Sequence, residues 1–217
     1  MRRSFLQTLG LLLFLGLTCS CKSVYYSTME QFGTHKRDIL VSRVDKARTS
    51  QEDAQEEFRT TLDSFKELTN FQGGELEDLY DRLKDGYDRC EDRAGAVTGR
   101  IEDIKSVSDD MFREWEAEID RDIADPDLAR KSRELMADSQ ARYDTMIGKM
   151  DAAAAKMEPV LVAFKSRVTF LKHNLNAQAI SSLKDTVIEI EDDVATLIED
   201  IQVSINEANS FIASMGA

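Results

Sequence analysis

The chain of 217 residues is poor in the residue types from which β-sheets are built. Aromatic residues make up 7%, and only two prolines and ten glycines are present. Charged residues make up 32%, and Glu, Lys and Arg are strong helix formers, as are Ala and Leu. The composition therefore predicts an all-α fold, and the length suits one domain with a sizeable core.

Histidine is scarce as well, with only His35 and His173 in the chain. Carboxylate-bridged metal sites in helical bundles need Glu-x-x-His on two helices, but Phe32 and Phe170 stand three residues before the two histidines. His173 instead suits the end of a helix, where positive charge is favourable. The sequence predicts no metal site and no cofactor.

The chain is strongly acidic, with a formal net charge of −13 at pH 7. Nucleic-acid binding needs a basic surface, so nucleic acid is excluded as a general partner. The densest carboxylate runs, residues 108–118 and 189–193, lie between expected core positions on an exposed face. Catalytic carboxylates need a cleft that shifts their pKa values, so we predict no catalytic residues and no enzyme.

Apolar runs are short, and the longest opens the chain. Arg2 and Arg3 precede the apolar segment Phe5–Leu17, which is too short for the roughly 20 residues that span a bilayer. This layout predicts a secretory signal peptide over residues 1–20.

The segment "LTCSC" that follows resembles the lipobox of bacterial lipoproteins. Ser20 before Cys21 fits the small residue at the cleavage site, whereas Thr18 before Cys19 fits less well. We therefore predict cleavage between Ser20 and Cys21, a lipid on Cys21 and a tether over residues 21–27. A thioredoxin-like pair is excluded, because only one residue separates Cys19 from Cys21.

The remainder, residues 28–217, reads as helices separated by turns. Gly73 and Gly74 end one helix, and Asp125 with Pro126 starts another. A weaker stop lies at Asn174–Asn176. We predict helices over residues 28–70, 75–121, 126–173 and 177–213, arranged as an elongated up-down-up-down antiparallel four-helix bundle. The alternative is a shorter bundle with one very long projecting helix.

Each predicted helix carries a coiled-coil-like stripe of apolar or small residues in steps of three and four. Cys90 lies on the second stripe, which predicts a packed, unreactive thiol. The stripes are Leu40, Val44, Ala47, Gln51, Ala54, Phe58, Leu62 and Phe65; Leu76, Tyr80, Leu83, Tyr87, Cys90, Ala94, Val97, Ile101, Ile104, Ser108, Met111 and Trp115; Leu128, Leu135, Ser139, Tyr143, Met146, Met150, Ala153 and Met157, then Phe164, Val168, Leu171 and Leu175; and Ile180, Leu183, Val187, Ile190, Val194, Leu197 and Ile201.

Three segments, "HKRDILVSRV" (35–44), "FQGGELEDLY" (71–80) and "MEPVLVAFKSRVTFLKHNLNAQAI" (157–180), resemble a family of Gram-negative lipoproteins described as a domain of unknown function. The resemblance implies an exported, lipidated, largely helical protein without an established activity. Lys22, rather than Asp, follows Cys21, and the resemblance to sorted lipoproteins implies an outer-membrane location facing the periplasm.

Two functions stay open from the sequence. The first is a lipid-anchored structural or interaction protein of the cell envelope, whose partners are the membrane, an envelope protein or a second copy of the chain. The alternative is a ligand carrier or hydrolase with a lined pocket. Antiparallel pairing of the helices also brings Phe112, Trp115 and Phe211 to one end, near the basic group His35, Lys36 and Arg37. These four residues, His35, Lys36, Arg37 and Trp115, are the predicted membrane- or partner-proximal surface.

Overall fold

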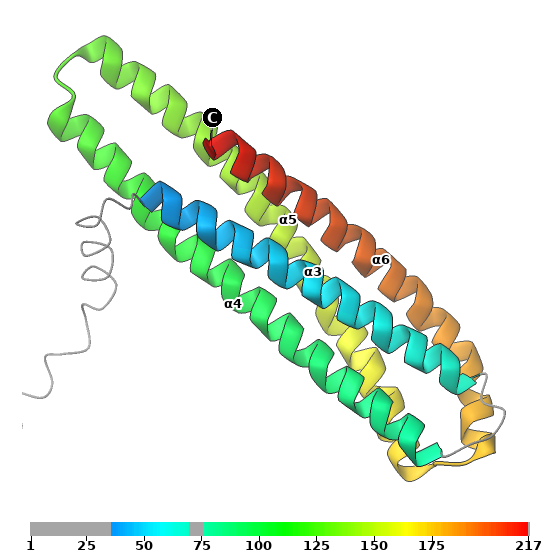
Figure 1. Ribbon diagram of the computed structural model, residues 1–217. Coiled ribbons are helices and arrows are strands. Elements are labelled where there is room, and N and C mark those ends of the chain that lie inside the picture. The colour runs from blue at the N-terminus through cyan, green and yellow to red at the C-terminus, as the bar shows by residue number, and fades with distance from the viewer. Residues whose placement is uncertain (1–35, 70–75, 217) are drawn as a thin grey trace, which may run out of the picture. The chain divides into compact units, whose positions relative to one another are not determined.

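The computed structural model describes residues 36–69 and 76–216, and every regular element in them is a helix. The helices are α3 (Lys36–Thr69), α4 (Leu76–Asp122), α5 (Pro126–His173) and α6 (Ala177–Gly216) (Figure 1). The all-α prediction is confirmed. The chain divides into two compact units between Ile39 and Leu40, and the packing below is that of the unit from Leu40 onward. The predicted signal peptide, the predicted tether and the predicted first helical residues, 28–35, lie outside the described residues.

Side-chain caps set the ends of α5 and the start of α6. The Asp125 carboxylate accepts hydrogen bonds from the backbone N–H groups of Asp127 and Leu128, at 2.8 and 3.2 Å. Asn174 caps the end of α5, and Asn176 accepts from two N–H groups of the first turn of α6. These asparagines cap the two helices at the weak stop that the sequence carries at Asn174–Asn176, so the predicted break is confirmed. The alternative of one very long projecting helix is wrong.

All four helices pack antiparallel to their neighbours in chain order, and α6 closes the bundle against α3 (Figure 1). Along each pair of neighbouring helices, the sequence positions of the contacting residues increase on one helix as they decrease on the other. Examples are Arg93 with Asp53 and Arg89 with Glu57 between α4 and α3, Lys105 with Asp151 between α4 and α5, Lys156 with Asp200 and Arg167 with Glu189 between α5 and α6, and Gln51 with Ser204 and Lys66 with Glu191 between α3 and α6. The up-down-up-down arrangement is confirmed.

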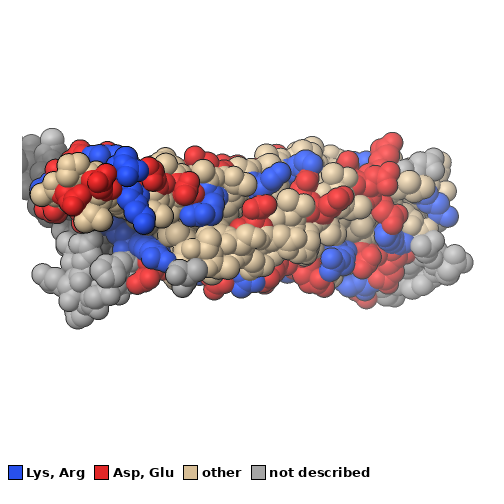
Figure 2. Space-filling model, turned by 90° about the horizontal axis from the view of Figure 1, so that it is seen from above, with Lys and Arg blue, Asp and Glu red and all other residues tan. Residues whose placement is uncertain are grey.

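The outer faces of the helices carry charges of both signs. Figure 2 shows acidic and basic side chains interspersed on one side of the bundle. Ion pairs such as Arg89 with Glu57 and Arg93 with Asp53 join neighbouring helices. Solvent-exposed ion pairs of this kind contribute little stability each. The free energy of folding must therefore come mainly from the buried stripes.

The predicted stripes of α3 and α6 are buried along their whole length. Phe164 of α5 stacks on Phe65 and Phe58 of α3, with ring centroids 5.0 and 6.1 Å apart. Gln51 and Ser204 form the buried polar pair of this core: the Gln51 amide donates to the Ser204 hydroxyl at 2.9 Å. Since a buried polar group is costly without its partner, this pair favours one register of α3 against α6.

Two parts of the predicted stripes are wrong. Leu76, Tyr80 and Trp115 are only half-buried, and Leu79 takes the core position at the start of α4. Leu128 and Leu135 of α5 are 60% and 52% exposed. The reason for the second error is helix length, because neither α3 nor α6 continues alongside the first turns of α5 (Figure 1).

We expect Leu197→Asp to destabilise the bundle strongly, because Leu197 is fully buried and an unpaired carboxylate would replace it. A loss of roughly 3 kcal/mol corresponds to a fall in Tm of about 6–12 °C for a domain of this size. Val203→Asp on the same helix is the matched control, since Val203 is 40% exposed. Thermal unfolding followed by circular dichroism measures both; equal Tm values would mean that this face of α6 is not core.

Candidate functional site

The hairpin of α4 and α5 runs past the end of α6 and past the start of α3 (Figure 1). Arg43, close to the start of α3, pairs with Asp103, whereas α4 continues to Asp122. Phe211, close to the end of α6, contacts Tyr143, whereas α5 begins at Pro126. We call the projecting part, residues 113–137, the tip.

Contacts between its own two helices hold the tip together. The Trp115 indole N–H donates to the Ser132 hydroxyl at 3.0 Å, and Arg133 pairs with Glu116 and Asp120. Ile119 of α4 is 1% exposed at this contact. The α4–α5 hairpin therefore stays packed where α3 and α6 no longer contribute.

Leu128 and Leu135, the tip leucines, lie on the stripe of α5 that forms the core farther along the bundle. They precede the fully buried Met146 by about five and about three helical turns at 3.6 residues per turn. The stripe therefore continues into the tip, but its leucines face solvent instead of a covering helix.

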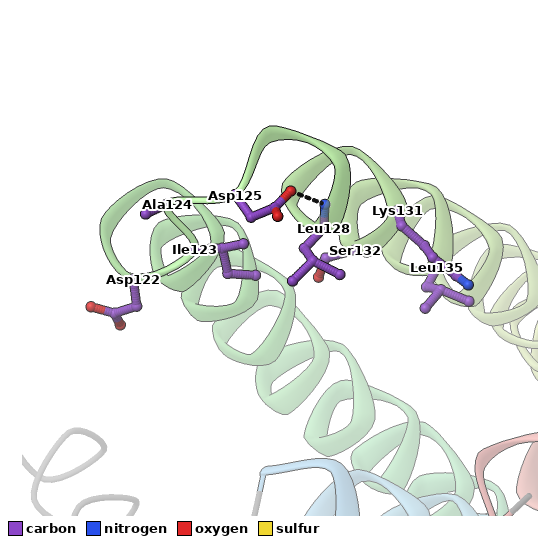
Figure 3. Close-up of a pocket in the computed structure, with 8 residues that line it drawn as sticks. All are labelled: Asp122, Ile123, Ala124, Asp125, Leu128, Lys131, Ser132 and Leu135. Atoms are coloured by element: carbon purple, nitrogen blue, oxygen red, sulfur yellow. Dashed lines mark hydrogen bonds between the residues drawn. The ribbon is translucent and has the colours of Figure 1, made fainter.

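A shallow hollow, open to solvent, lies beside the tip leucines. Figure 3 shows Leu128, Ser132 and Leu135 on one side of α5, with Ile123 of the connection next to Leu128. Three polar groups of the lining have structural partners: the Asp125 carboxylate caps α5, the Ser132 hydroxyl accepts from Trp115, and the Asp122 carboxylate accepts from Arg121. The full lining is Asp122, Ile123, Ala124, Asp125, Leu128, Lys131, Ser132 and Leu135.

An aromatic cluster forms the base of the tip, where α4, α5 and α6 meet. The Tyr143 ring lies edge-on to Phe112 and to Phe211, with centroids 5.9 and 6.5 Å apart. Burial raises the pKa of the Tyr143 hydroxyl above its usual value. The sequence correctly predicted that Phe112 and Phe211 lie at one end, but the cluster places them in the core rather than on a surface.

The other predicted site residues have different outcomes. Cys21, Ser20 and His35 lie outside the described residues, so their roles stay predictions. Lys36 and Arg37 form the start of α3, and His173 ends α5 as predicted. Within the ranges 36–69 and 76–216, no group of three or more His, Cys, Asp or Glu side chains is arranged to hold a metal ion.

Cys90 lies buried between α3 and α4. Its Sγ is 3.3 Å from the Thr61 hydroxyl, and a Cβ at Gly86, one turn away, would come within 2.8 Å of the same hydroxyl. Burial raises the pKa of the Cys90 thiol to about 12. The neutral thiol therefore stabilises the fold below pH 9, and this contribution is lost as the pH rises toward 12.

The family model described as "Protein of unknown function (DUF2959)" matches residues 25–215. The chain therefore belongs to this family, and the predicted membership of a domain of unknown function is confirmed. Neither the curated proteins nor the solved structures contain a match to the chain. In the part of the chain that the structure describes, no helix is both long and apolar enough to span a membrane.

We expect Cys90 to react with a disulfide reagent only when the bundle unfolds, because the thiolate is the nucleophile and burial suppresses it. In a chain of residues 22–217, whose single cysteine is Cys90, the native rate at pH 8 should be lower by a factor on the order of a thousand than the rate in denaturant, as the raised pKa implies. Absorbance of the released thiol measures both rates. A native rate close to the denatured one would mean that Cys90 is accessible.

Proposed function

We propose that the protein is a lipid-anchored interaction protein of the bacterial cell envelope that binds a protein partner through its tip. One observation carries the proposal: Leu128 and Leu135 are more than half exposed on the stripe that elsewhere forms the core. Singly scattered surface leucines are ordinary, but apolar residues that gather beside a hollow are typical of interaction sites.

The proposed anchor is supported by the beginning of the sequence. Arg2 and Arg3, the apolar segment that follows and the lipobox-like "LTCSC" are the parts of a lipoprotein signal peptide. Lys22 after Cys21 supports an outer-membrane location facing the periplasm. A lipid on Cys21 would tether the bundle to the membrane surface.

A ligand carrier or hydrolase is the second function that the sequence leaves open, and it would use the hollow at the tip. The polar groups there argue for a docking surface instead. Asp125 and Ser132 are engaged in a helix cap and in the Trp115 hydrogen bond, and these contacts hold the hairpin in shape. Leu128, Leu135 and Ile123 supply an apolar surface suited to another polypeptide.

For the anchor, we expect Cys21→Ser to leave a precursor that retains residues 1–20 and takes up no fatty acid. Cys19→Ser is the matched control and should be processed and acylated like the natural chain. Electrophoretic mobility and incorporation of labelled palmitate measure the two steps. Normal processing of Cys21→Ser together with failure of Cys19→Ser would place the lipid on the other cysteine.

For the docking surface, we expect a photoreactive amino acid at position 135 to crosslink to a protein in intact envelopes. Position 162 on the same helix is the matched control, because Leu135 and Val162 are 52% and 53% exposed. Immunoblotting should detect a crosslinked species from position 135 only. If both positions crosslink equally, or neither does, the tip is no preferred contact surface.

A further inference from the structure

The uncovered face of the tip carries Leu128 and Leu135, with Lys131 between them, along α5, and it is acidic along α4. Glu118 and Asp122 follow the buried Met111 by about two and about three helical turns, so they continue the core stripe of α4. Both are exposed. The stripe of α4 thus changes from apolar to acidic beyond the start of α3, while the stripe of α5 keeps its leucines.

The α4 half of the tip is acidic overall, although Arg121 pairs with Asp122, and Arg133 of α5 pairs with Glu116 and Asp120. Residues 113–122 hold five acidic and two basic side chains: Glu114, Glu116, Glu118, Asp120 and Asp122 against Arg113 and Arg121. The whole chain also carries a net charge of −13. An occupant of this face must therefore cover leucines on one edge and meet carboxylates on the other.

Two kinds of occupant would bring negative charge against this acidic edge. A second tip, laid antiparallel so that the two bundles point apart, would bring α4 against α4 and Glu118 and Asp122 against their own copies. An anionic phospholipid surface would meet the same carboxylates with like charge. Like charges brought together at an interface cost free energy, so both occupants are disfavoured.

We propose that the tip binds an amphipathic helix of another protein that carries basic residues along one edge. Apolar side chains of that helix, spaced seven residues apart, cover Leu128 and Leu135, whose separation is the same. Its Lys or Arg side chains lie over Glu118 and Asp122. The incoming helix takes the place that α3 and α6 occupy along the rest of the hairpin.

This inference rests on the proposed docking surface and adds the chemistry of its partner. The probe is an 18-residue peptide with leucine at the heptad positions a and d and lysine elsewhere; a second peptide carries glutamate in place of lysine. The protein is the mature chain, residues 21–217, without lipid. Trp115 is the single tryptophan and touches Ser132 between the tip leucines, so its emission reports binding.

We expect the lysine peptide to bind at least about tenfold more tightly than the glutamate peptide and to shift the Trp115 emission. Leu128→Ser with Leu135→Ser should weaken binding at least about tenfold. Ile188→Ser with Val162→Ser is the matched control, because these residues are 61% and 53% exposed and lie away from the tip. Glu118→Lys with Asp122→Lys should reverse the preference between the peptides.

Two results would overturn the inference. One is equal affinity of the two peptides, or binding that the serine variants at the tip leave unchanged. The other is a dimer in equilibrium sedimentation that only the tip serine variants dissociate, which would make a second copy the occupant. In either case, crosslinking from position 135 in envelopes still tests the docking surface itself, so the two proposals fail separately.

Discussion

The unequal length of the four helices is the constraint on which the rest of the structure depends. Helices α4 and α5 have 47 and 48 residues, whereas α3 and α6 have 34 and 40. An apolar stripe is stable in water only where another element covers it. Along most of the bundle each stripe has that cover, and at the tip, among the residues that the structure describes, the two longer helices have only each other. The exposed leucines and the acidic edge follow from this difference.

Register decides which residues reach the tip, and a few contacts inside the bundle favour that register. The Gln51–Ser204 pair ties α3 to α6, because sliding either helix would leave a buried polar group unpaired. The close approach at Gly86 and Thr61 ties α3 to α4, since a larger residue at position 86 would meet the Thr61 hydroxyl. Both contacts lie in the covered part of the bundle.

The sequence was sufficient to predict the helices and most of the core, since the steps of three and four in α3 and α6 match the buried residues. It also predicted the break between α5 and α6, although only asparagines mark it. Leu128 and Leu135 were wrongly placed in the core, because a stripe shows that a face is apolar but not that another helix reaches it. That information lies in the ends of α3 and α6 and in the antiparallel register, which no local pattern contains.

The central claim is that α3 and α6 leave the tip uncovered, and hydrogen exchange at backbone amides tests it most directly. In a chain of residues 21–217 at low concentration, amides of residues 113–137 should exchange much faster than those of residues 143–168, because uncovered helices open locally at lower free energy. Mass spectrometry of peptides from both regions measures the difference. Protection in residues 113–137 equal to that in residues 143–168 would contradict the account, since the tip would then be covered within the chain.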